Sequence, residues 1–161
     1  MVMWYMKINK YLLCTKNDKQ TFELGVQLAK LKIKSICLVG DLGSGKTILA
    51  KGYAKGLGIK GHITSPTFNI INRYEENDII FNHMDAYRIT SEEMLYDIGF
   101  EELFDKDSYV IIEWANNIEN AIPKDTLWIY IKRDTNNINT RYITINCNKE
   151  QLLEIGLKRI C

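Results

Sequence analysis

The sequence is poor in the residues that form metal clusters and disulfide frameworks. Its 161 residues include only four cysteines and two histidines, and none of the cysteines forms a C-x-x-C pair. Structural zinc sites combine several such ligands at close spacing, and disulfide scaffolds are dense in cysteine. We therefore expect neither a zinc site nor disulfides, but reduced thiols in a cytosolic protein.

Long hydrophobic runs and an excess of charge are absent as well. No apolar stretch approaches the roughly 20 residues of a membrane-spanning helix, and the apolar start MVMWYM is shorter than a secretory signal and precedes its positive charge. The net charge is +1, so the chain as a whole is not built to coat nucleic acid. These features predict a cytoplasmic protein without membrane contact and with one domain over residues 1–161.

Helical and strand-like segments alternate along the chain. Helices are predicted where apolar residues recur at helical spacing or follow an N-cap, and strands where short apolar runs end at turn residues. The expected helices are 17–31, 46–58, 90–104 and 149–160, and the expected strands are 35–39, 67–74, 78–84, 109–114, 126–132 and 141–147. The nearly unbroken apolar runs 35–39 and 109–114 predict buried parallel strands. The pairs 67–74 with 78–84 and 126–132 with 141–147 predict antiparallel strands. The pattern indicates an α/β, P-loop NTPase-like three-layer fold with a mixed, partly parallel central sheet.

The stretch GDLGSGKT, residues 40–47, satisfies the phosphate-loop pattern G-x-x-x-x-G-K-[ST]. A buried strand is predicted before it and a helix after it, as a phosphate loop requires. Glycines let the backbone turn its N–H groups toward an anion, Lys46 can reach the terminal phosphates, and Thr47 can ligate Mg²⁺. The helix also presents its positive end to the phosphates. The candidate nucleotide contacts are Gly40, Gly43, Ser44, Gly45, Lys46, Thr47 and, through its backbone N–H, Ile48.

The phosphate loop alone leaves several functional classes open. A GTPase is disfavoured because no N-K-x-D or D-x-x-G motif follows the loop. A small-molecule kinase usually needs a lid with several arginines, and the five arginines here are dispersed along the chain. The remaining candidates are an ATPase, a small-molecule kinase that uses the same loop, and a nucleotide-gated binding module with incidental turnover.

Two acids at the ends of predicted strands are candidates to complete the site. Asp85 follows the run IIFNHM and Glu113 follows YVII, where parallel strands end and ligands bind. One carboxylate would hold Mg²⁺ and the other would orient or deprotonate a water molecule. The segment TSPTF, residues 64–68, lies where phosphate-loop proteins have a switch that senses the terminal phosphate, although an ordinary Ser-Pro turn is an equal alternative.

Four motifs in a fixed order resemble one family. GDLGSGKT, SPTF, HMDAYR and IEW follow one another at spacings similar to those of the TsaE family, small bacterial ATPases of tRNA threonylcarbamoyladenosine synthesis. The resemblance spans roughly residues 15–141. It implies that Lys46 and the surrounding loop bind ATP, and that Thr47 and Glu113 ligate Mg²⁺.

The same resemblance implies roles for further residues and for partners. Asp85 matches the family's essential aspartate near the reacting phosphate, and Trp114 matches its tryptophan beside the metal-binding glutamate. Thr67 falls in the switch-like S-P-T segment, and residues 15–18 would lie near the adenine. As a family member, the protein would hydrolyse ATP weakly until its partners TsaB and TsaD activate it. It would serve the modification of tRNA adenosine-37 and contact tRNA only indirectly, through that complex.

Overall fold

The computed structural model describes residues 9–147. The predicted helix 149–160 and the MVMWYM segment lie outside the described residues. The strands are β1 Asn9–Thr15, β2 Ser35–Val39, β3 Ile71–Glu76, β4 Ile79–Asp85, β5 Ser108–Glu113, β6 Leu127–Arg133 and β7 Arg141–Cys147. The helices are α1 Asp18–Lys30, α2 Lys46–Leu57 and α3 Glu92–Asp97, with 3₁₀ segments η1 Phe100–Phe104 and η2 Ala115–Ala121.

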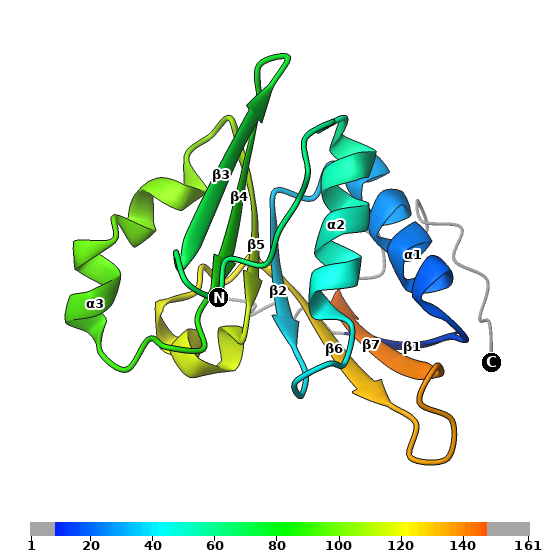
Figure 1. Cartoon of the computed structure of the whole chain (residues 1–161). Coiled ribbons are helices and arrows are strands. Elements are labelled where there is room, and N and C mark those ends of the chain that lie inside the picture. Colours follow the sequence, from blue (N-terminus) through cyan, green and yellow to red (C-terminus); the bar gives the residue numbers. More distant parts are fainter. Residues whose placement is uncertain (1–8, 148–161) are drawn as a thin grey trace, which may run out of the picture.

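Within residues 9–147 the strands form one mixed sheet in the order β1-β7-β6-β2-β5-β4-β3 (Figure 1). The strands β6, β2, β5 and β4 run parallel to one another. Antiparallel pairs extend the sheet at both edges, through β7 and β1 on one side and β3 on the other. The predicted α/β fold with a partly parallel central sheet is therefore confirmed.

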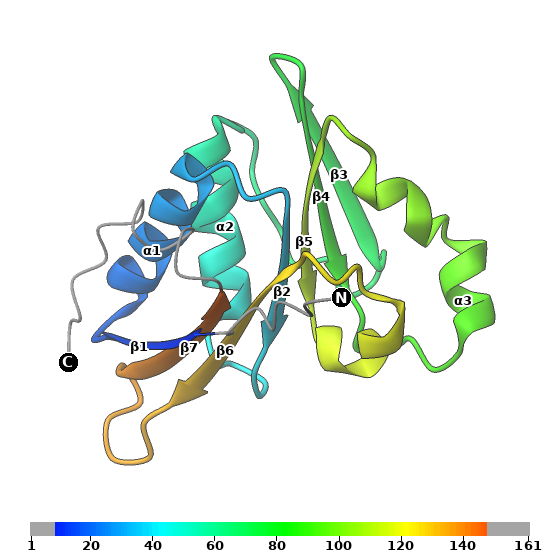
Figure 2. The same ribbon diagram turned by 180° about the vertical axis from the view of Figure 1, so that it is seen from behind.

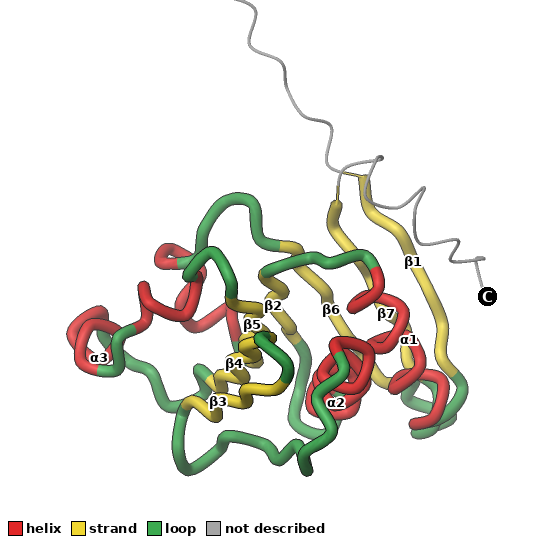
Figure 3. The backbone as a smooth tube through the Cα atoms, turned by 90° about the horizontal axis from the view of Figure 1, so that it is seen from above, coloured by secondary structure: helices red, strands yellow, loops and turns green. Residues whose placement is uncertain are grey.

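Helices cover both faces of the sheet, which gives three layers. Seen from above, α1 and α2 lie on one face and α3 with the 3₁₀ segments on the other (Figure 3), and the view from behind shows the same separation (Figure 2). Successive residues of β2 explain this arrangement, because Ile36 and Leu38 pack in the core under α1 and α2, whereas Cys37 packs in the core under α3. Both faces of the central strands are thus apolar, as is typical of parallel strands.

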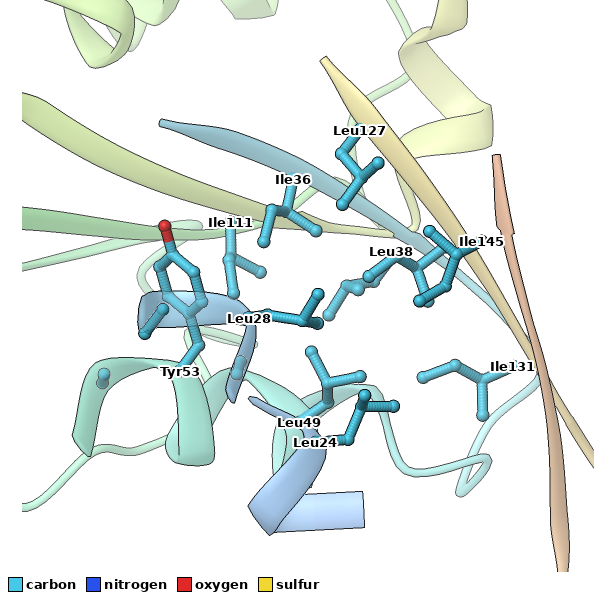
Figure 4. Packing of buried hydrophobic residues seen from close by; sticks show 14 of the residues in the cluster. Leu24, Leu28, Ile36, Leu38, Leu49, Tyr53, Ile111, Leu127, Ile131 and Ile145 are labelled. Atoms are coloured by element: carbon cyan, nitrogen blue, oxygen red, sulfur yellow. The ribbon is translucent and has the colours of Figure 1, made fainter. Parts of the chain in front are cut away.

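The larger core lies between the sheet and the pair α1 and α2 (Figure 4). Leu28 of α1 and Leu49 of α2 are fully buried there against Ile36 and Ile111 of the sheet. The helix α1 begins where predicted, because the Asn17 side chain accepts a hydrogen bond from the Gln20 N–H and caps its N-terminus. This core holds α2, and hence the loop that precedes it, firmly against the central strands.

The helices α1 and α2 approach so closely that glycine is required where they meet. A Cβ atom at Gly52 would lie 1.9 Å from the Phe22 carbonyl oxygen, which is backbone and cannot rotate away. We therefore expect Gly52→Ala to lower the free energy of unfolding by about 1–3 kcal/mol, the usual cost of overpacking. Chemical denaturation measures this change. Gly61→Ala is the control, because a Cβ atom there meets nothing within 4 Å; equal losses in the two variants would contradict the close-packing account.

The predicted single helix over residues 90–104 is wrong in its continuity. The helix α3 begins after Ser91, whose hydroxyl accepts a hydrogen bond from the Met94 N–H at 3.3 Å, and ends at Asp97. Gly99 then adopts a left-handed conformation with φ 68°, and the chain continues as η1. A left-handed glycine ends a helix because it turns the chain away from the helical path.

None of the helices within residues 9–147 has the length and the hydropathy that a membrane-spanning helix needs.

Two further differences concern strands. Patterning does not predict β1, which pairs antiparallel with β7 from the opposite end of the described chain, Thr15 facing Arg141. The predicted β3–β4 hairpin is present, but β3 is Ile71–Glu76 instead of 67–74, and the turn is formed by Asn77 and Asp78, with φ 49° and 63°. Positive φ at both central residues is the signature of a type I′ turn, which Asn and Asp tolerate well.

Candidate functional site

The predicted phosphate loop connects the end of β2 to the start of α2 at the carboxyl edge of the parallel strands (Figure 1). Open α/β sheets bind their ligands at this edge. Gly43 and Gly45 have φ values of 73° and 111°, which residues with side chains rarely adopt. At Gly40 an added Cβ atom would lie 2.5 Å from the Ile131 carbonyl oxygen. The three glycines therefore allow the tight turn directly before α2, whose N-terminus favours anions.

The Lys46 side chain folds back on the first residues of the phosphate loop. Its Nζ donates to the carbonyl oxygens of Gly40 at 2.6 Å and Asp41 at 2.9 Å, and it lies 4.3 Å from the centre of the Trp114 ring. Burial lowers the pKa of Lys46, while the nearby carboxylates of Glu113, Asp85 and Asp41 oppose that shift. The lysine thus holds a desolvated position from which it can exchange carbonyl partners for phosphate oxygens.

Beside Lys46, a hydroxyl, a carboxylate and an imidazole meet. Thr47 donates its hydroxyl to the Glu113 carboxylate, with Oγ1 2.9 Å from Oε1 and 3.1 Å from Oε2. His83 Nε2 lies 2.8 Å from Glu113 Oε1. Glu113 is 3% exposed and His83 is fully buried. Because side chains alternate along a strand, His83 and Glu113 lie on the sheet face that also carries Phe81 and Ile111, which is the face toward α2.

Asp85 ends the strand next to the one that ends in Glu113, and the two residues are direct partners in the parallel register. Its Oδ1 accepts a hydrogen bond from the Tyr87 N–H at 2.9 Å. Burial raises the pKa of Asp85, and the charge of Glu113 adds to this shift, while the Tyr87 hydrogen bond, His83 and Lys46 oppose it. Asp85 is therefore a buried carboxyl group with raised basicity at the wall of the site.

Lys46, Thr47, Asp85 and Glu113 line one cleft of about 500 Å³. The structure brings most of the predicted site residues to this cleft. Gly40 is not among its lining residues, but its carbonyl oxygen accepts a hydrogen bond from Lys46. Ser65 and Thr67 of the predicted switch segment reach the wall of the cleft, and their hydroxyls lie 2.9 Å apart. The lining residues are Asp18, Leu42, Gly43, Ser44, Gly45, Lys46, Thr47, Ile48, Ser65, Thr67, Asp85, Tyr87, Glu113, Trp114, Arg133 and Arg141.

Trp114 follows Glu113 in an unusual backbone conformation. Its φ is 56°, in the left-handed region that bulky residues rarely enter. The ring packs against Tyr87, with the ring centres 4.9 Å apart, and lies over the Lys46 ammonium group. Strained residues of this kind cluster at functional sites. Here the strain turns the chain away after Glu113 and brings an aromatic surface to the edge of the cleft.

Sequence reasoning missed two buried groups of this site. Arg141 is 1% exposed, and its Nε donates to the Ser44 carbonyl oxygen at 2.9 Å while another guanidinium nitrogen contacts the Asp18 carboxylate at 2.5 Å. No local pattern joins residues so distant in the chain. His83, in contrast, precedes Asp85 by two positions on a predicted strand, and the alternation of strand faces could have indicated it.

The oxygen atoms of Thr47 and Glu113 fit Mg²⁺. This ion prefers oxygen ligands and is commonly held by one or two protein groups together with substrate phosphates and water. In the described part of the chain, no three His, Cys, Asp or Glu side chains form a candidate metal cluster. A cation bound by Thr47 and Glu113 would take its remaining ligands from water or from phosphate groups.

Comparisons with known proteins agree with these features. The model of the family described as "Threonylcarbamoyl adenosine biosynthesis protein TsaE" matches residues 15–143. A Bacillus subtilis "tRNA threonylcarbamoyladenosine biosynthesis protein TsaE" is 44% identical over 98 residues, which are 61% of this chain and 61% of that protein, so the match spans less than two thirds of that relative. A Rickettsia felis protein of the same description is 31% identical over 146 residues, 89% and 85% of the two chains. The crystal structure of Bacillus subtilis YdiB aligns with a TM-score of 0.76 and 30% identity, over 92% of this chain and 95% of that chain.

Proposed function

From the premise that this chain belongs to the TsaE family of tRNA threonylcarbamoyladenosine biosynthesis, we propose that it is a Mg²⁺-dependent ATPase that assists the TsaB–TsaD complex. The observation that carries the proposal is the contact between Thr47 and Glu113 beside the buried Lys46, at the end of the phosphate loop. The modest net charge of +1 suits a protein that contacts tRNA only through that complex.

Lys46 and the backbone N–H groups of the loop would bind the terminal phosphates of ATP. The ammonium group is held by two neutral carbonyl oxygens, those of Gly40 and Asp41. A phosphate oxygen carries negative charge, so it adds Coulombic attraction to the hydrogen bond that a neutral carbonyl oxygen also accepts. The exchange of these carbonyl partners for phosphate oxygens therefore favours the bound state.

Thr47 and Glu113 would hold Mg²⁺ between them. When bound, this ion neutralises the phosphate oxygens and polarises the phosphorus centre. In the structure the Thr47 hydroxyl donates a hydrogen bond to Glu113. To bind the metal, the hydroxyl would rotate so that its hydrogen points away and its oxygen faces the ion. Both carboxylate oxygens of Glu113 already lie within about 3 Å of Thr47 Oγ1. Glu113 could therefore offer an oxygen to the same metal ion without a movement of its strand.

Asp85 would act on the attacking water. The water oxygen bonds to the γ-phosphorus as the bond to the ADP oxygen breaks, and the carboxylate of Asp85 accepts the released proton. The raised pKa of Asp85, due mainly to burial, makes the carboxylate a stronger base than an exposed aspartate. The Tyr87 N–H holds one carboxylate oxygen in place and leaves the other for the water.

Incubation with ATP, Mg²⁺ and purified TsaB–TsaD tests the proposal. We expect ATP consumption that rises when the partners are added. Transfer of phosphate to an added metabolite would instead support the small-molecule kinase that the phosphate loop alone leaves open. Nucleotide-dependent association with no measurable turnover would support a binding module.

Glu113→Ala should separate metal binding from nucleotide binding. In EDTA the variant should bind ATP nearly as well as the parent, because the loop and Lys46 are intact. On addition of Mg²⁺ the parent should gain affinity, and the variant should lose about tenfold or more of that gain, as loss of a metal ligand predicts. Calorimetric titration under both conditions measures the difference. Equal losses with and without Mg²⁺ would remove Glu113 from the metal site.

A further inference from the structure

His83 is the most deeply buried polar group beside the site, and the mechanism above does not use it. It lies on β4, is fully buried, and directs Nε2 to Oε1 of Glu113 at 2.8 Å. We propose that His83 is a positioning residue whose N–H fixes the Glu113 carboxylate for Mg²⁺. This inference rests on the proposed function, because it assigns His83 a role in the same metal site.

The first argument comes from the partners of Glu113. Within residues 9–147, its carboxylate has hydrogen bonds to Thr47 and to His83. The Thr47 hydroxyl cannot donate to Glu113 and offer the same oxygen to the metal in an unchanged orientation. Once Thr47 turns toward the metal, His83 is the remaining side chain that holds Glu113. Groups that hold a metal ligand in this way orient it and tune its affinity.

The second argument comes from the ring itself. A carboxylate only accepts hydrogen bonds, so the short contact requires the proton on Nε2 of His83. The other nitrogen, Nδ1, is buried and has no hydrogen-bond partner among the described residues. The N–H of Nε2 is therefore used on Glu113. Among the described residues, the side chain of His83 therefore has one hydrogen-bond partner, the carboxylate of Glu113.

The third argument comes from how the ring is held. The Phe81 ring stacks near His83, with ring centres 6.0 Å apart and an angle of 20° between the planes. The parallel pairing of β4 with β5 places Ile111 directly opposite His83. Rigid apolar neighbours on the same sheet face leave the imidazole little freedom to turn. A fixed donor of this kind preorganises Glu113 before the metal arrives.

Three variants test the role. His83→Leu removes the donor and keeps an apolar side chain in the buried space, whereas His83→Gln retains an N–H donor of similar reach. Phe81→Leu is the matched control, because it disturbs the same face of β4 without touching Glu113. For each protein, the affinity for a nonhydrolysable ATP analogue is measured in EDTA and in Mg²⁺, and the melting temperature is recorded.

We expect His83→Leu to leave the affinity in EDTA nearly unchanged and to lose about tenfold of the gain that Mg²⁺ confers. His83→Gln should recover most of that gain, and Phe81→Leu should lower the melting temperature but keep the gain. An undiminished Mg²⁺ gain in His83→Leu, or equal losses in Phe81→Leu, would overturn the inference. A parent protein with no Mg²⁺ gain at all would instead refute the proposed function.

A spectroscopic measurement tests the bond without metal or nucleotide. The chain has only two histidines, so ¹⁵N-histidine labelling gives spectra that are readily assigned with His83→Gln. We expect the proton on Nε2 of His83 in the parent, and a changed Nε2 resonance in Glu113→Ala. A ring protonated only on Nδ1 would overturn the inference, because Nε2 could then donate nothing to Glu113.

Discussion

Lys46→Ala is expected to weaken ATP binding on the order of 100-fold. Hydrogen bonds to charged groups contribute about 1.5–3 kcal/mol each, and about 1.4 kcal/mol corresponds to tenfold in affinity. The ammonium group is already buried in the free protein, where Nζ donates to the carbonyl oxygens of Gly40 and Asp41. ATP binding therefore adds little further desolvation of Lys46. Calorimetric titration with a nonhydrolysable ATP analogue and Mg²⁺ measures the loss.

Lys55→Ala is the control for this variant, because Lys55 is an exposed residue of the same helix. It removes the same charge from α2 without changing the site. Melting temperatures of both variants establish that each is folded. A Lys46→Ala protein that binds the analogue as tightly as Lys55→Ala would show that the loop does not hold the phosphates.

Asp85→Asn should slow hydrolysis far more than it weakens binding. General base catalysis contributes roughly 10²- to 10⁴-fold to a rate, so we expect a fall of at least about 100-fold in single-turnover hydrolysis. Loss of a negative charge beside the phosphates should leave ATP affinity equal or higher. The Asn side chain keeps an oxygen that can accept from the Tyr87 N–H, so the local structure should persist.

The control for Asp85→Asn is Asp107→Asn, which makes the same change at an exposed turn before β5. Single-turnover rates at saturating ATP separate the chemical step from binding. If Asp85→Asn hydrolyses ATP at the parent's rate, Asp85 does not accept the proton of the water. If both binding and hydrolysis fall together, Asp85 contributes to the structure of the site rather than to the chemistry.

The part of the site that follows from local rules could be predicted from the sequence. The phosphate loop is recognised in the sequence by its glycines together with Lys46 and Thr47. The buried strand predicted before it indicates where the loop lies relative to the sheet. Asp85 and Glu113 end apolar runs, and parallel strands bring such ends together. In the structure these two acids are indeed direct partners in the register of β4 and β5.

Contacts between distant segments could not be predicted in the same way. Arg141 carries no local signal, yet it is buried against the Ser44 carbonyl oxygen and the Asp18 carboxylate. The strand β1 is stabilised by antiparallel pairing with β7. The pattern of residues 9–15 alone does not predict that pairing. Both features depend on tertiary structure rather than on local pattern. Gly99, in contrast, is a local signal, because a glycine in the left-handed conformation commonly ends a helix, and the prediction of one helix over 90–104 does not use it.

One structural observation supports the role proposed for these groups. Lys46, Thr47, Asp85 and Glu113 come from α2 and from two neighbouring strands and line one cleft, where Thr47 is half-buried and the other three are buried. Buried charges are costly unless they are paired or bind a ligand. These four residues thus supply one cation, two carboxyl groups and a hydroxyl, the groups that the proposed metal-bound triphosphate would contact.

A crystal structure of the protein with a nonhydrolysable ATP analogue and Mg²⁺ tests the central claim most directly. We predict that the loop at residues 40–47 surrounds the phosphates, that Lys46 Nζ has left the Gly40 and Asp41 carbonyl oxygens, and that Thr47 and Glu113 share one metal ion. Phosphates bound elsewhere, or a metal ion that neither Thr47 nor Glu113 approaches, would contradict the account.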